Sequence, residues 1–94
     1  MKEDFLPLGT IVRLKEAKRY VVVIGYTVVE EGSKDIWDYL GCAYPMGVMD
    51  PTKNLLFNKE QIEEVIYTGF RDEEGRRFRK KLSESLKKIK NKNV

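Results

Sequence analysis

The sequence contains no histidine and only one cysteine, Cys42, in its 94 residues. Without histidine it lacks the usual general base of a catalytic triad and the commonest metal-binding side chain. A lone cysteine forms no disulfide within the chain, which fits a reducing compartment. We expect Cys42 to be a buried core residue rather than a nucleophile, because no histidine is present to activate it. The composition therefore predicts no catalytic residues, no metal site and no cofactor.

Long apolar runs and glycine-rich phosphate loops are missing as well. The longest apolar run, Tyr20–Ile24, is far shorter than the roughly 20 residues that span a bilayer. The first residues, Met1–Asp4, carry acids, and no apolar segment as long as that of a signal peptide follows them, so the sequence predicts no signal peptide and a cytoplasmic protein. The seven glycines are scattered and match neither the dinucleotide fingerprint nor the P-loop.

Charge is divided unevenly along the chain. Residues 1–70 hold eight Lys/Arg and eleven Asp/Glu, whereas residues 71–94 hold ten Lys/Arg and four Asp/Glu. We call residues 5–70 the body and residues 71–94 the tail of a single domain that spans residues 1–94. The body is thus mildly acidic and the tail basic. A basic tail is commonly a solvated helix face, and it also suits a partner with an acidic surface.

Five short segments of the body are predicted to form β-strands. They are rich in β-branched and aromatic residues, and several show period-2 alternation. Their close spacing predicts an antiparallel sheet, and Gly25 is expected to mark a bend. The predicted strands cover residues 10–15, 19–29, 36–44, 55–57 and 62–70. The expected core is Ile11 or its neighbours Val12 and Leu14, together with Val21, Val23, Leu40, Cys42, Leu56, Val65 and Tyr67.

The periodicity changes after Asp72. Phe78, Leu82, Leu86 and Ile89 are spaced four, four and three residues apart, as in one apolar stripe of a helix. Acids precede this stripe and lysines follow it, which complements the helix dipole. We therefore predict a helix over about residues 76–90. The predicted fold class is α+β: a small bent antiparallel sheet or partly open β-barrel of about five strands, followed by a C-terminal amphipathic helix.

Neither the acids nor the aromatic residues of the body form a convincing reactive or nucleic-acid-binding group. Glu63 and Glu64 are neighbours in a predicted strand and point to opposite faces, so they do not converge on a substrate. Asp35 and Asp38 offer too few oxygens for a calcium loop. We therefore expect no enzymatic activity. Stacking aromatics are present, but the strands carry acids and the body is net negative, which argues against nucleic-acid binding.

Four motifs occur in a fixed order: LPLGTIV at residues 6–12, DYLGCAYPMG at 38–47, LFNKEQI at 56–62 and EVIYTGF at 64–70. Together they resemble the small, functionally unassigned domain encoded beside LXG polymorphic toxins in type VII secretion clusters of Gram-positive bacteria. The resemblance covers about residues 5–80, and the family pattern often has an acid where this chain has Met46. It implies an accessory role, as an adaptor or chaperone-like partner of a secreted toxin or its export machinery, and it supplies no catalytic or ligand residues.

Two surfaces are candidates for binding such a protein partner. The stripe of Phe78, Leu82, Leu86 and Ile89 is narrow enough for a helix contact, and its basic flanks would steer it to an acidic surface. If the stripe packs on its own body instead, the sheet edge or the turn with Pro45 and Met46 is the expected contact. The alternatives to an adaptor are a nucleic-acid-binding module and a toxin-neutralising, immunity-type protein.

Overall fold

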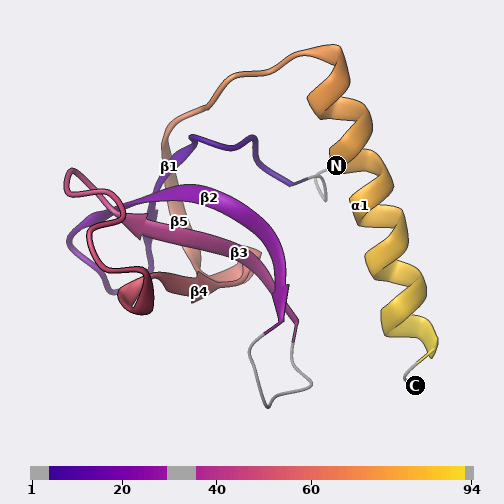
Figure 1. Ribbon diagram of the computed structural model, residues 1–94, viewed down its shortest axis with the longest axis horizontal. Coiled ribbons are helices and arrows are strands. Elements are labelled where there is room, and N and C mark those ends of the chain that lie inside the picture. Colours follow the sequence, from indigo (N-terminus) through magenta and orange to yellow (C-terminus); the bar gives the residue numbers. More distant parts are fainter. Residues whose placement is uncertain (1–4, 30–35, 93–94) are drawn as a thin grey trace.

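The computed structural model describes residues 5–29 and 36–92, with side chains described for residues 5–27 and 36–86. Within these residues, five strands form one antiparallel sheet in the order β4-β3-β2-β1-β5, and one α-helix follows (Figure 1). The elements are β1 (Ile11–Leu14), β2 (Tyr20–Val29), β3 (Ile36–Ala43), β4 (Leu55–Phe57), β5 (Ile62–Tyr67) and α1 (Glu73–Lys92). The predicted α+β class is confirmed.

The boundaries agree with the sequence except near the junction of body and tail. The last strand ends at Tyr67 rather than at Phe70, and α1 begins at Glu73 rather than at residue 76. The earlier start has a local cause, because Oδ1 of Asp72 accepts a hydrogen bond from the backbone N–H of Gly75 at 2.9 Å. An aspartate at this position satisfies a backbone donor that the first helical turn leaves free.

A bulge in β2 curls the sheet. The pairing of β2 with β3 shifts register between Val23 and Gly25, as predicted for the bend at Gly25. Figure 1 shows β2 as a long, strongly curved strand, with α1 standing beside the sheet. The bend allows one sheet face to wrap around a small core.

The core lies on one face of the curled sheet. Among the expected residues, Val12, Val21 and Val23 belong to this core, while Cys42 is buried but is not part of the cluster. Phe5 of the N-terminal segment and Leu86 of α1 complete the main cluster, so the start and the end of the chain both contribute to it. The core cluster comprises Phe5, Val12, Val21, Val23, Tyr39, Phe57 and Leu86.

Two of the core predictions are wrong because β5 is an edge strand. Val65 and Tyr67 are both exposed, since β5 pairs only with β1 within the sheet and its outer side has no neighbouring strand. Leu40 and Leu56 are only partly buried, because they face away from the core. The alternate face of β3 supplies the core instead: the ring of Tyr39 stacks on Phe57 at 5.3 Å between centroids.

The N-terminal segment is attached to the sheet through the two backbone polar groups of Leu6. Its N–H donates to the hydroxyl of Tyr39 at 2.9 Å, and its carbonyl accepts from the hydroxyl of Tyr26 at 2.6 Å. Both tyrosine rings also make edge-on contacts with Phe5. Burial raises the pKa of Tyr39 to about 12, so the hydroxyl stays protonated far above neutral pH.

Asp38 connects β3 to the turn that precedes β5. Its backbone N–H donates to Oδ1 of Asn58, and its carboxylate accepts from the backbone N–H of Lys59, both at 2.9 Å. Asp38 is buried, so its role is structural, and its sequence neighbour Asp35 lies outside the described residues.

Replacing Asp38 with alanine is expected to lower the free energy of unfolding by about 1–2 kcal/mol, because the N–H of Lys59 loses a charged acceptor. Urea denaturation measures the change. The matched control is Glu63→Ala on the exposed side of β5, for which we expect less than about 0.5 kcal/mol. Equal losses for the two variants would show that the Asp38 contact contributes nothing special.

Candidate functional site

The apolar stripe of the tail is largely occupied by the protein's own body. Leu86 is only 8% exposed and belongs to the core cluster, and Leu82 packs against that cluster. Phe78, at the other end of the stripe, remains 56% exposed and contacts Tyr26 with ring centroids 6.2 Å apart. The side chain of Ile89 lies outside the described residues. Of the described stripe, only Phe78 is substantially accessible to another molecule.

Pro45 and Met46 form a separate, exposed surface. They lie in the turn after β3, where the Tyr44–Pro45 peptide bond is cis, and the neighbouring Met49 is also strongly exposed. This turn borders a shallow pocket of about 200 Å³. Figure 1 shows the turn at the end of the sheet far from α1. The structure therefore does not bring Phe78 and Met46 together, and the two predicted surfaces are distinct.

A larger pocket, of about 390 Å³, lies between the bend of β2 and the first turns of α1. We call it the sheet–helix pocket. Its wall is mainly apolar, with one carboxylate and one guanidinium among the lining groups. The lining residues are Leu8, Ile24, Gly25, Tyr26, Phe70, Asp72, Gly75, Phe78 and Arg79.

Two segments far apart in sequence close one side of the sheet–helix pocket. The backbone N–H of Gly69 donates to the hydroxyl of Thr10 at 3.0 Å. A Cβ atom on Gly69 would stand 2.1 Å from the carbonyl oxygen of Leu8, so the two backbones approach as closely as only glycine permits. This contact places Leu8 and Phe70 at the same pocket.

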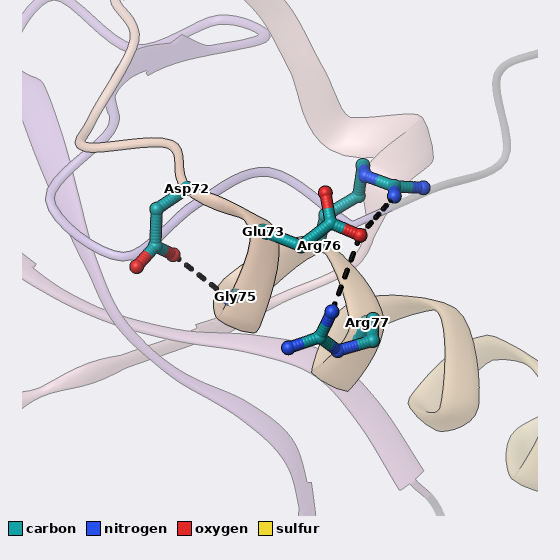
Figure 2. A network of polar contacts seen from close by, with 5 residues as sticks. All are labelled: Asp72, Glu73, Gly75, Arg76 and Arg77. Atoms are coloured by element: carbon teal, nitrogen blue, oxygen red, sulfur yellow. Dashed lines mark hydrogen bonds and ion pairs between the residues drawn. The ribbon is translucent and has the colours of Figure 1, made fainter.

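The first turn of α1 carries a local polar network (Figure 2). Asp72 caps the turn through Gly75, as described above, while the carboxylate of Glu73 pairs with Arg76 and Arg77. The Glu73–Arg77 pair spans 3.3 Å, and all three side chains are more than half exposed. Exposed pairs of this kind contribute little to stability. They do hold Arg76 and Arg77 over the first turn, apart from the pocket-lining Arg79.

Arg79 is the charged group that the fold buries beside the pocket, with only 6% of its surface exposed. Its side chain lies close to Tyr26. Burial raises the pKa of Tyr26, and the interaction with Arg79 partly opposes that rise. The arrangement places a cation and the hydroxyl of Tyr26 beside apolar side chains. Such a lining is suited to binding a ligand that carries both an apolar part and a negative charge.

The sequence prediction missed this site. Arg79 lies three residues before Leu82 and seven before Leu86, and therefore on the same helix face. A cation on the apolar face of a helix is a recognisable sequence pattern, but the predicted stripe consists of apolar residues alone and so leaves Arg79 out. The approach of Phe70 to Leu8 had no local signature. Cys42 is buried as expected, and within the described residues no three His, Cys, Asp or Glu side chains gather as metal ligands.

Fold and site together define a small α+β protein with a ligand-sized pocket between its sheet and its helix. The family model described as "Domain of unknown function (DUF4176)" matches residues 5–78, and the chain belongs to this family. Every lining residue of the pocket except Arg79 falls inside the matched region. No curated protein and no solved structure matches the chain. In the described part of the chain, no helix is long and apolar enough to cross a membrane.

Proposed function

We propose that this protein is a non-enzymatic accessory, an adaptor or chaperone-like partner of an LXG toxin or of that toxin's helical accessory protein, acting in the bacterial cytoplasm before export. The observation that carries the protein-binding part is the gathering of exposed apolar side chains around the sheet–helix pocket. Phe70 is 79% exposed and Phe78 is 56% exposed, and both line it together with the exposed Leu8. Clustered exposed apolar residues mark interaction sites. The four sequence motifs support the choice of partner.

The tail supports the same proposal through its charge. Leu82 and Leu86 turn toward the core, whereas four basic residues of α1 are exposed: Arg76, Arg77, Lys80 and Lys81. The side chains of Arg76 and Arg77 are more than 60% exposed. A positive helix surface beside an apolar rim would steer an acidic partner toward the pocket and speed association.

The turn with Pro45 and Met46 offers a second surface for the same partner. Met46 and Met49 are exposed there, and exposed methionines suit adaptable protein contacts because their side chains are flexible and polarizable. An elongated toxin segment could contact this turn and the pocket from opposite ends of the sheet.

Co-expression with the neighbouring toxin-cluster proteins tests the proposal. We expect the toxin or its helical accessory to co-purify with the wild-type chain. The variant Phe70→Glu/Phe78→Glu should reduce the recovered partner at least tenfold, because charge replaces the apolar rim. The variant Met46→Glu/Met49→Glu also replaces two exposed apolar side chains, and it measures separately how much the turn contributes to binding.

Other outcomes would contradict the adaptor proposal. If no toxin-cluster protein is recovered, the adaptor proposal fails. Binding of single-stranded nucleic acid with a steep salt dependence would instead favour the alternative of a nucleic-acid-binding module. Tyr39 is buried in the core and is not available to stack on a base. Protection of cells against the active toxin would instead indicate an immunity-type protein.

A further inference from the structure

Arg79 is buried without a carboxylate partner among the residues that the structure describes. The ion pairs there involve Arg13, Arg76 and Arg77 but not Arg79. Its polar neighbour is the hydroxyl of Tyr26, which is neutral at physiological pH. A buried cation is costly to keep unless an opposite charge compensates it. Because Arg79 forms no ion pair within the described residues, a ligand carboxylate in the pocket would meet a guanidinium that is still open to direct pairing.

The position of Arg79 shows where that ligand would lie. The side chain lines the sheet–helix pocket, whose volume of about 390 Å³ falls within the range of pockets that hold small ligands. The lining also includes apolar residues, among them Leu8, Ile24 and Phe70. A ligand in this pocket therefore meets apolar surface and a buried guanidinium together.

Gly75 leaves a gap between Arg79 and Asp72. A Cβ atom at Gly75 would stand 3.0 Å from Nη1 of Arg79 and 3.1 Å from Oδ1 of Asp72. The cation and the carboxylate therefore flank one narrow space that a larger residue would fill. The carboxylate of Asp72 accepts one hydrogen bond from Gly75, and a carboxylate has capacity for further donors.

We propose that the sheet–helix pocket binds the free carboxyl end of a polypeptide whose last side chain is apolar. The terminal carboxylate pairs with Arg79, and the last side chain enters between Phe70 and Phe78. The N–H of the final peptide unit donates to Asp72. Each group of the pocket thus meets a group that every apolar chain end carries.

This inference rests on the proposed protein-binding function and specifies the chemistry of the partner. A free fatty acid carries the same carboxylate on an apolar chain but has no N–H. Asp72 therefore distinguishes the two sources: it attracts the peptide end and repels the fatty acid.

Nuclear magnetic resonance titration of the intact protein tests the inference with short acetylated peptides that end in phenylalanine. The peptide with a free carboxylate should bind at least tenfold more tightly than the same peptide with a C-terminal amide. Its binding should shift resonances of Gly75 and Phe70. Equal affinity for the acid and the amide would overturn the proposal, and so would tighter binding of decanoate than of any peptide acid.

Variants of the pocket provide the second test. Arg79→Met should weaken the peptide acid at least tenfold, because it removes the cation that pairs with the terminal carboxylate. Arg13→Met, in β1 and outside the pocket lining, is the matched control and should leave affinity unchanged. Should Arg79→Met fail to fold, Gly75→Ala decides, because alanine favours the helix while its Cβ fills the gap. Undiminished binding by Gly75→Ala would overturn the proposal.

Asp72→Asn separates the two ligand sources, since asparagine keeps the helix cap. It should weaken the peptide acid several-fold and strengthen decanoate, and the opposite pattern would contradict the assigned role of Asp72. None of these titrations uses a toxin-cluster protein. If the protein binds its toxin but does not bind peptides with a free carboxylate, the proposed function stands and the inference about the pocket is wrong.

Discussion

Replacing Gly41 with alanine should lower the free energy of unfolding by about 2–3 kcal/mol, because extra volume in a packed core forces neighbouring groups to move. Gly41 lies in β3 directly under the core. A Cβ atom there would stand 2.5 Å from Cγ1 of Val21 and 2.8 Å from Cε1 of Phe57. Both neighbours are buried, so neither side chain has free space into which to retreat. Urea denaturation measures the loss.

A second substitution shows whether the clash is the cause. Val21→Ala removes the nearest atom, so the double variant should be more stable than the sum of the two single losses predicts, with a coupling of about 1 kcal/mol or more. Gly25→Ala is the matched glycine control, since its nearest contact is Cβ of Leu40 at 3.3 Å. If the losses in the free energy of unfolding for Gly41→Ala and Val21→Ala simply add, or if Gly25→Ala loses as much as Gly41→Ala, the clash is not the cause.

Stability should also fall steeply in alkaline solution. In the folded protein the pKa of Tyr39 is about 12, whereas an unfolded tyrosine has a pKa of about 10. Between these values the unfolded chain releases the proton and the folded chain retains it, so rising pH favours unfolding. The expected loss from Tyr39 is about 2–3 kcal/mol between pH 10 and pH 12. Tyr26, whose pKa is also raised, acts in the same direction.

The test compares how steeply the free energy of unfolding falls with pH in each protein, rather than the free energy at one pH. Tyr39→Phe loses its hydrogen bond to Leu6 at every pH, but its stability should decline much less between pH 10 and pH 12. Tyr44→Phe is the matched control, because Tyr44 is exposed and should leave the slope unchanged. Lysine titration is common to all three proteins and cancels in the comparison. Identical slopes for wild type and Tyr39→Phe would refute the assignment.

Local pattern predicted the strands and the helix because their signals are short-range. The β-branched run of β2 and the apolar spacing from Phe78 to Leu86 each specify an element within a few residues. The core face was harder to predict, since alternation in β3 separates Tyr39 from Leu40 without saying which one faces inward. The contact of Tyr39 with Phe57 joins different strands, and no local pattern reports it.

The candidate site was less predictable than the fold, for a related reason. Pro45 and Met46, which the sequence offers as a candidate contact, are both exposed. The sheet–helix pocket, in contrast, depends on the crossing of Leu8 and Gly69 and on the burial of Arg79. Basic residues are usually solvated, so the sequence gives no reason to separate Arg79 from its exposed neighbours. Its burial follows from how α1 docks.

The contact between Thr10 and Gly69 has a consequence for timing during synthesis. These residues are 59 positions apart, and Phe70, Gly75 and Arg79 follow them in the chain. A ribosome-bound chain that has just completed β3 and β4 can pair those strands, but it still lacks one wall of the pocket. Because contacts of such long range form late, the binding site comes into being only near the end of folding. A partner that uses the pocket would therefore select finished molecules and pass over nascent ones.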